Sequence, residues 1–218
     1  MVNEINLLSN YPKAKRNITH RHQVQEENRA IAREFGEAFF DGERDQGYGG
    51  YRYDGRWVPV ARDFVDHWGL KPGDRVLDIG CAKGFLVKDL MGVCPGLEVF
   101  GLDISDYAVT HCEPEVVGRL HVGSCDRLPF PNNSFDAAIS INTVHNLDHE
   151  GCVLALREMK RVSPRNNYVQ IDSYRTPQEK QNMEDWVLTA VTTYDPEGWR
   201  ALFAEAGYDG DYYWTITE

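Results

Sequence analysis

Short apolar segments alternate with longer amphipathic segments between residues 75 and 172. Residues 137–141 form a nearly continuous apolar run, which is typical of a strand covered on both faces. Similar runs predict strands at 75–79, 98–102, 118–123, 137–141 and 168–172. Strands separated by helical segments favour βαβ units, so the pattern predicts an α/β fold with a parallel sheet.

Apolar residues spaced by three or four positions predict the helices. Residues 23–40 read as one helix, because Ile31, Phe35 and Phe39 lie on one stripe among charged residues. The same spacing predicts helices at 58–68, 105–112, 151–162, 177–185 and 197–206. Residues 187–194 are expected to be extended or mixed, and 212–217 to form a last strand.

Residues 41–57 follow neither the period of a strand nor that of a helix. They contain five glycines and four aromatic residues, namely Tyr48, Tyr51, Tyr53 and Trp57. Aromatic groups on a loop supply shape and hydrogen-bonding tips, so this loop is interpreted either as a lid over a site or as a tether for the preceding helix. The sequence accordingly divides into an N-terminal helical and lid segment, 1–56, and a main domain, 57–218.

The rest of the chain is organised around residues 75–90, RVLDIGCAKGFLVKDL. A short apolar run ends near Asp78, a glycine-containing turn follows, and a helical pattern begins at Phe85. Such an arrangement exposes backbone N–H groups and a helix N-terminus to a ligand. The dinucleotide fingerprint G-x-G-x-x-G is not met, because Ala82 and Phe85 stand where glycines are needed.

The pattern Asp78-x-Gly80-x-Ala82-x-Gly84 resembles the first motif of the class I S-adenosylmethionine-dependent methyltransferases, Asp/Glu-x-Gly-x-Gly-x-Gly. Further features of that family follow in order: an acidic residue closing the second strand, an adenine-type loop, the segments flanking the fourth strand, and a last helix ending in Ala-Gly-aromatic. In this chain they are Asp103, 123–130, 133–136, 144–147 and 199–208. The resemblance covers about residues 70–218.

This resemblance implies a Rossmann-like fold, with a mostly parallel seven-stranded-type sheet, helices on both faces and an N-terminal cap. It implies S-adenosyl-L-methionine as cofactor and S-adenosyl-L-homocysteine as product. Asp103 would accept hydrogen bonds from the ribose hydroxyls, while Asp78 would orient the turn and reach the methionine amino group. The cofactor-binding residues implied are Asp78, Gly80, Ala82, Gly84, Asp103, Ile104, Ser124, Cys125, Ser140 and Ile141.

Two positions depart from the family pattern. Ala82 replaces a glycine, so its backbone must either keep a negative φ or tolerate crowding. Ser124 stands where an acidic residue often binds the adenine amino group. Ser124 can still accept a hydrogen bond, and Asp126 is the alternative.

His145 is the candidate general base, because it lies just past the fourth strand, where the methyl group should point. The alternative is a histidine that packs against the cofactor or caps the strand. Other candidate bases are His20, His22 and Asp172. The candidate substrate contacts are Tyr48, Tyr51, Tyr53 and Asn142, and Trp186 and Tyr194 could roof a pocket.

The substrate class is narrowed by motifs that are absent. The chain has no Asn/Asp-Pro-Pro-aromatic motif, no Pro-Cys nucleophile and no apparent Lys-Asp-Lys-Glu tetrad, and its net charge is −11. These features disfavour nucleic acids. The resemblance is to the small-molecule, ubiquinone-biosynthesis-like branch, so we expect transfer to oxygen or nitrogen of a sugar, quinone precursor or natural product. A non-catalytic cofactor-binding subunit and an aminopropyltransferase are the alternatives.

Cysteine usage and hydropathy indicate the cellular environment expected for the protein. The five cysteines are scattered singly, without a C-x-x-C pair, so we expect reduced thiols and no metal site. No apolar run approaches the length of a membrane span. The expectation is a cytoplasmic monomer or homodimer with a small-molecule substrate and without nucleic-acid or membrane partners.

Overall fold

One parallel sheet organises the computed structural model, which describes residues 3–12, 18 and 25–217. In this described part the sheet has six strands in the order β3-β2-β1-β4-β5-β6. The strands are β1 (Arg75–Ile79), β2 (Glu98–Asp103), β3 (Leu120–Val122), β4 (Ala137–Ile141), β5 (Asn166–Ser173) and β6 (Asp211–Ile216). All five neighbouring pairs are parallel, as the βαβ pattern predicts.

The strand order reverses direction at the centre of the sheet. β1 pairs with β2 on one side, where Asp78 lies opposite Gly101, and with β4 on the other, where Ile79 lies opposite Ser140. Crossover connections therefore leave β1 and β4 in opposite directions. The carboxyl ends of the strands at such a reversal are where open α/β sheets bind ligands.

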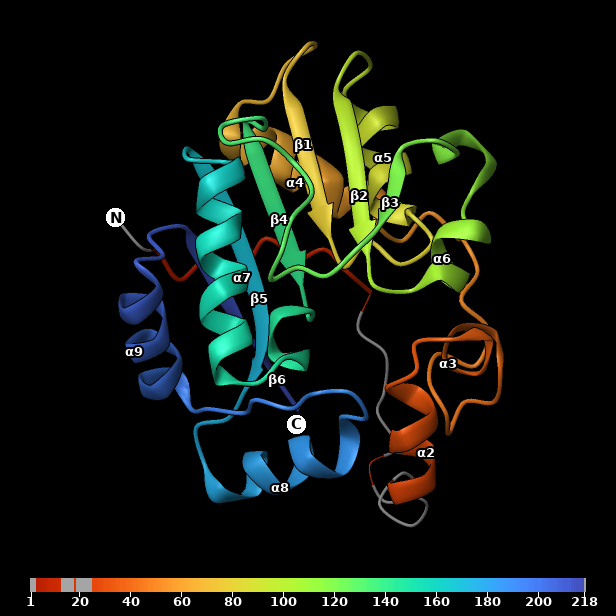
Figure 1. The fold of residues 1–218 in the computed structure, drawn as a ribbon, viewed down its shortest axis with the longest axis vertical. Coiled ribbons are helices and arrows are strands. Elements are labelled where there is room, and N and C mark those ends of the chain that lie inside the picture. Colours follow the sequence, from red (N-terminus) through yellow and green to blue (C-terminus); the bar gives the residue numbers. More distant parts are fainter. Residues whose placement is uncertain (1–2, 13–17, 19–24, 218) are drawn as a thin grey trace.

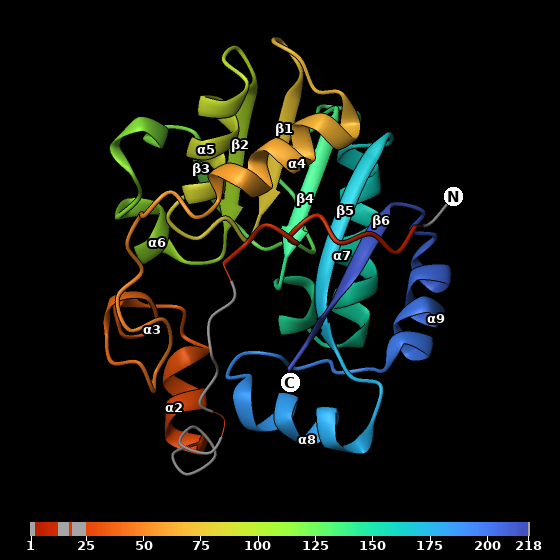
Figure 2. The same ribbon diagram turned by 180° about the vertical axis from the view of Figure 1, so that it is seen from behind.

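Helices cover both faces of the sheet, as Figures 1 and 2 show. α4 (Val58–Trp68) and α5 (Phe85–Val93) pack on one face, and α7 (His149–Val162) and α9 (Pro196–Ala206) on the other. The shorter helices are α6 (Asp106–Thr110), η1 (Pro114–Val116) and η2 (Val144–Asn146). The α/β class with two helical layers is thus confirmed. None of the helices described is both long enough and apolar enough to cross a bilayer.

Three helices lie beyond the carboxyl ends of the strands (Figure 1): α2 (Gln25–Ala32), α3 (Glu37–Asp41) and α8 (Pro177–Trp186). The prediction of one helix over 23–40 is wrong in its described part. Phe35 adopts φ +50°, a left-handed conformation that interrupts a right-handed helix, so the chain turns between α2 and α3. Residues 25–56 are called the cap below.

Residues 3–12 cross the back of the sheet near β5 and β6 (Figure 2). Glu4 forms an isolated parallel bridge with Tyr212, and the Ile5 N–H donates to the Tyr212 carbonyl at 2.9 Å. Leu7 is buried in the apolar core shared with α4 and α5. The start of the described chain therefore packs on the main domain rather than on the cap.

Candidate active site

The turn between β1 and α5, residues 80–84, lies at the carboxyl end of the central strand. Gly80 has φ +81°, and a Cβ atom there would lie 1.9 Å from the Oγ1 of Thr143, which follows β4. Only glycine allows this close approach. Ala82 has φ +50°, so of the two conformations expected for it, the crowded positive-φ one is adopted.

Asp103 fixes this turn to the end of β2. Its two carboxylate oxygens accept hydrogen bonds from the backbone N–H groups of Ala82 at 2.7 Å and Ser105 at 2.8 Å. Burial raises the pKa of Asp103, although these N–H groups favour the ionised form. The bond to Ala82 holds the alanine in its strained conformation, so Asp103 shapes the turn in addition to any contact with a ribose.

Asp78 lies beneath the turn and is 4% exposed. Burial, together with the nearby charge of Asp103, raises its pKa to about 8. The carboxyl group is therefore mostly protonated at neutral pH. A cationic group bound beside it would favour the carboxylate, because opposite charges lower the pKa of an acid.

The residue that follows β2 is an exposed apolar side chain. Ile104, directly after Asp103, is 54% exposed, whereas Cys125 is buried in the core. Burial raises the pKa of the Cys125 thiol to about 12, so it remains protonated and serves packing. Ser124 and Asp126 are half-buried. Ile104 thus presents a flat apolar contact beside two groups that can accept hydrogen bonds.

Ser140 and Ile141 are the last two residues of β4. Ser140 is 1% exposed, and its Oγ atom has no hydrogen-bond partner among the described residues. A buried hydroxyl without a partner costs free energy, so such a group calls for an explanation, of which a ligand is one. Ile141 is half-buried. Thr143 fills the space beside Gly80, which leaves the Ser140 hydroxyl as the polar group that a ligand at the end of β4 could satisfy.

The cap packs directly on the glycine turn. Phe40 forms a buried cluster with Ala82 and Ala108. Tyr51 stacks on Phe85, the first residue of α5, with ring centroids 4.4 Å apart and planes 9° apart. Tyr48 contacts Tyr51 at a centroid distance of 4.3 Å. Tyr51 therefore covers the start of α5 beside the turn, and Tyr48 packs on Tyr51.

Tyr53 also contacts Phe85, edge-on at a centroid distance of 5.6 Å, but its hydroxyl is bound on the flank of α5. Its hydroxyl donates to the Asp89 carboxylate on α5 at 2.6 Å, and this hydrogen bond raises the Tyr53 pKa to about 12. The Lys88 ammonium lies 3.9 Å from the centroid of the Tyr53 ring. Tyr53 therefore anchors the cap on the flank of α5.

Polar contacts that sequence reasoning missed also join the cap to the turn. The Lys83 ammonium and the Tyr107 hydroxyl both donate to the Asp41 carboxylate, at 2.5 and 2.8 Å. The Ser105 hydroxyl donates to the Phe35 carbonyl. The sequence carries no local signal for these contacts, because Asp41 and Lys83 are 42 positions apart. These contacts hold the cap against the glycine turn, so the cap forms one side of the candidate site.

His145 is 2% exposed and lies between β5 and the segment leading to α9. Its Nδ1 accepts a hydrogen bond from the Asp172 backbone N–H at 3.1 Å, and its Nε2 lies 3.5 Å from the Asp172 carboxylate. Burial lowers the His145 pKa despite this carboxylate, so the ring is neutral and its single proton is on Nε2. Both ring nitrogens therefore face Asp172.

Asn142 follows β4 with φ +52° and is exposed. Its side-chain oxygen accepts a hydrogen bond from the Thr215 hydroxyl of β6 at 3.0 Å. The candidate bases His20 and His22 lie outside the described residues. The histidine and asparagine predicted after β4 are thus placed differently: His145 faces the core and Asn142 faces solvent.

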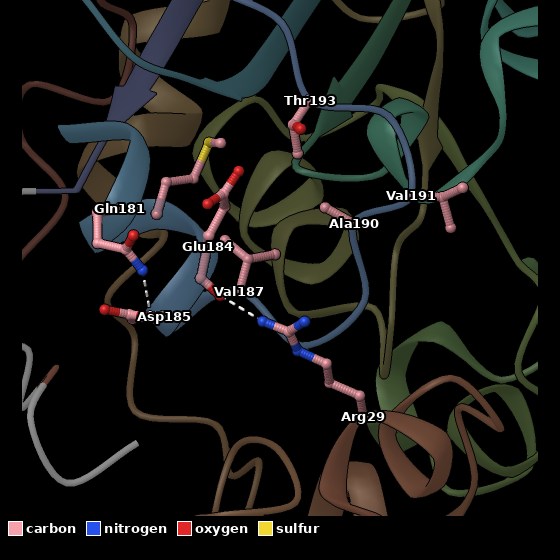
Figure 3. Close-up of a pocket in the computed structure, with 9 residues that line it drawn as sticks. Arg29, Gln181, Glu184, Asp185, Val187, Ala190, Val191 and Thr193 are labelled. Carbon is pink, nitrogen blue, oxygen red and sulfur yellow. Dashed lines mark hydrogen bonds between the residues drawn. The ribbon is translucent and has the colours of Figure 1, made fainter. Parts of the chain in front are cut away.

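A pocket of about 440 Å³ separates α2 from α8 (Figure 3). Arg29 of α2 closes one side by donating to the Glu184 backbone carbonyl of α8. The other lining residues are Gln181, Met183, Glu184, Asp185, Val187, Ala190, Val191 and Thr193. The backbone N–H of Val191 donates to the His145 carbonyl at 2.9 Å, so this pocket adjoins the segment after β4.

The two predicted roof residues lie on either side of this pocket's loop without lining it. The Arg44 guanidinium lies 5.4 Å from the Trp186 ring, which ties the cap to α8. Tyr194 packs against Trp199 of α9 at a centroid distance of 5.4 Å. Neither forms part of the pocket lining.

Residues 77–171 match the family described as a methyltransferase domain. A sterol 24-C-methyltransferase of Gibberella zeae is 35% identical over 99 residues, 42% of this chain and 26% of that protein. A demethylmenaquinone methyltransferase of Symbiobacterium thermophilum is 34% identical over 90 residues, 38% of this chain and 36% of that protein. The chain thus spans 26–36% of the length of these curated relatives.

A solved structure shares the fold. It is the complex between the Haloferax volcanii Trm112 methyltransferase activator and a methyltransferase. The match has a TM-score of 0.57 at 22% identity, and covers 85% of this chain and 77% of that one. At this identity the likeness concerns the fold alone. The matched family segment runs from β1 to β5, so it contains the glycine turn, Asp103 and the end of β4.

Proposed function

We propose that this chain, whose residues 77–171 form a class I S-adenosylmethionine-dependent methyltransferase domain, transfers a methyl group to oxygen or nitrogen of a small-molecule metabolite. The observation that carries the proposal is the set of residues at the carboxyl ends of β1 and β2. There Gly80, the two buried carboxyl groups Asp78 and Asp103, and the exposed Ile104 lie together within the matched segment.

Each of these residues has a role suited to the cofactor. The Asp103 carboxylate retains lone pairs for the ribose diol while it accepts two backbone hydrogen bonds. Ile104 offers its exposed side chain to the adenine face, and Ser124 or Asp126 would accept from the adenine amino group. Asp78 would ionise beside the methionine ammonium. When bound, S-adenosylmethionine supplies a methyl group activated by a sulfonium sulfur.

The acceptor is proposed to be a small organic molecule, for example a sugar, a quinone precursor or a natural product. A pocket of about 440 Å³ between α2 and α8 has the volume of a small-ligand site, and it adjoins the segment after β4 through the hydrogen bond from Val191 to His145. The matched relatives include methyltransferases named for a sterol and for demethylmenaquinone.

Calorimetric titration with S-adenosylmethionine and S-adenosylhomocysteine tests the cofactor assignment. We expect micromolar binding to the wild type and at least about tenfold weaker binding to Asp103→Asn, which loses acceptor capacity on one oxygen. Asp106→Asn is the matched control, because Asp106 is an exposed acid three residues away. Wild type that binds neither ligand would refute the assignment.

Catalysis is tested separately by adding methyl-labelled S-adenosylmethionine and the protein to a cell extract. A labelled product that requires the protein supports a methyltransferase. Cofactor binding without labelled product would instead favour the alternative of a cofactor-binding partner subunit.

A further inference from the structure

A chain of four polar side chains leads from the core to the end of β4. The buried Tyr168 hydroxyl donates to Gln170 Oε1 at 3.2 Å, and Gln170 Nε2 donates to the Thr215 hydroxyl at 2.9 Å. The Thr215 hydroxyl then donates to Asn142 Oδ1 at 3.0 Å. Each group accepts from one neighbour and donates to the next, so the chain has a single direction.

The buried end fixes this direction. Tyr168 is 0% exposed, and its phenolic hydroxyl donates its single hydrogen to Gln170 Oε1. The Thr215 hydroxyl has one hydrogen and accepts a hydrogen bond from Gln170. It therefore donates that hydrogen to Asn142.

Asn142 is consequently held with its oxygen toward Thr215 and its amide NH2 pointing away. Its backbone N–H donates to the Gln170 carbonyl at 2.8 Å, which fixes the left-handed conformation of φ +52°. Among the residues that the structure describes, none accepts a hydrogen bond from Asn142 Nδ2. The next residue, Thr143, presses against Gly80. Two amide hydrogens are therefore presented to solvent beside the glycine turn.

His145, three residues further on, complements this observation. Its Nδ1 lone pair is used by the Asp172 N–H, and its Nε2 carries the proton and faces the Asp172 carboxylate. The ring therefore has no lone pair available to deprotonate an acceptor in this conformation. A methyl acceptor bound at Asn142 must therefore already carry a nucleophilic lone pair, because His145 cannot deprotonate it.

We propose that the acceptor is an acidic oxygen, such as a phenolate, enolate or carboxylate, and that Asn142 Nδ2 binds this oxygen and makes the protein selective for it. The inference deepens the proposed methyl transfer and rests on it. Thr215 and Gln170 act as positioning residues that keep the Asn142 amide in this orientation.

The chemistry of the step agrees with this assignment. The acceptor oxygen attacks the methyl carbon, a C–O bond forms, and the C–S bond breaks with its electron pair passing to sulfur. The oxygen loses its negative charge and the sulfur its positive charge, so no proton is transferred. An aliphatic amine is a poorer acceptor for two reasons. Its ammonium form must lose a proton to a base before it can attack, and its N–H groups would face the N–H groups of Asn142 without an acceptor between them.

Matched acceptors test the proposal. The 218-residue protein is incubated with methyl-labelled S-adenosylmethionine and the pairs 4-nitrophenol with 4-nitroaniline and benzoate with benzylamine, and also with a cell extract. Mass spectrometry assigns each labelled methyl to oxygen or nitrogen. The variants are Asn142→Asp, which replaces the donors by an acceptor, Thr215→Val, and Thr215→Ser, which restores the hydroxyl.

We expect wild type to label oxygen, and Asn142→Asp to lower the oxygen-to-nitrogen product ratio by at least about tenfold. Thr215→Val should lower the same ratio about two- to tenfold, and Thr215→Ser should restore it. If Thr215 had only a structural role, Thr215→Val would change the total activity and leave the ratio unchanged. Labelling of nitrogen by the wild type, or an oxygen-to-nitrogen ratio unchanged in Asn142→Asp, would overturn this inference. The proposed methyltransferase function would still hold. No labelled product from protein that binds the cofactor would overturn both.

Discussion

The Asp41 carboxylate of the cap lies 2.5 Å from the Lys83 ammonium of the glycine turn. The Lys83 side chain is 10% exposed and the Asp41 side chain 28%, and Tyr107 donates a second hydrogen bond to Asp41. Burial opposes ionisation of Asp41, but the hydrogen bonds from Lys83 and Tyr107 outweigh it and lower the Asp41 pKa. The cap is therefore fastened by charge to the turn that is proposed to hold the cofactor.

Removing this charge should loosen the cap over its ligand. We expect Asp41→Asn to speed dissociation of S-adenosylhomocysteine about two- to tenfold, the range for losing roughly 0.5–1.5 kcal/mol of hydrogen bonding. Stopped-flow fluorescence measures this rate. Glu43→Gln is the control, because Glu43 is an exposed acid of the same loop. Equal rates in Asp41→Asn and wild type would mean that the contact does not restrain the ligand.

Cofactor binding should be coupled to release of a proton from Asp78. The pKa of its buried carboxyl is raised to about 8, so the group is protonated at pH 7. A methionine ammonium beside it lowers that pKa and expels the proton, hence affinity should rise with pH between about 6 and 8. Calorimetry at pH 7 in buffers of different ionisation enthalpy counts the protons released.

Asp78→Asn cannot release this proton and serves as the control. We expect it to bind more weakly and to give the same enthalpy in every buffer. A binding enthalpy of wild type that is equally independent of the buffer would contradict the role of Asp78.

The aromatic contacts of the cap should matter more for activity than for folding. Tyr51→Ala removes the stack on Phe85, and Tyr48→Ala removes a side chain that is 45% exposed. We expect at least about tenfold lower labelled-product formation with modest changes in melting temperature. Tyr53→Phe, which loses only the bond to Asp89, should retain activity. Normal activity in both alanine variants would refute the lid hypothesis.

His145→Gln separates a positioning role from general-base catalysis. Glutamine can still accept from the Asp172 N–H, so we expect a lower melting temperature but less than about tenfold loss of methyl transfer, with an unchanged pH–rate profile. A general base would contribute about 10²–10⁴-fold. A loss in that range by a folded variant, together with a lost pH dependence, would instead assign His145 as the base.

The sequence by itself determined the elements whose pattern is local. β1 and β4 have the predicted bounds, because a buried strand needs only a short apolar run between turns. The fold class and the glycine turn were also predictable, since the spacing of Asp78, Gly80 and Gly84 reflects local backbone requirements. The break at Phe35 was not, because the apolar stripe of residues 23–40 continues through it.

Only the tertiary structure decided what the candidate side chains face. Asn142 and Thr215 are 73 residues apart, and Asp41 and Lys83 are 42 apart. Neither pairing leaves a trace in local periodicity, because parallel pairing of β5 with β6 and packing of the cap bring these residues together. The sequence could nominate His145 and Asn142 as neighbours after one strand. It could not show that the His145 ring points into the core while the Asn142 amide points to solvent. Those orientations depend on hydrogen bonds with β5 and β6.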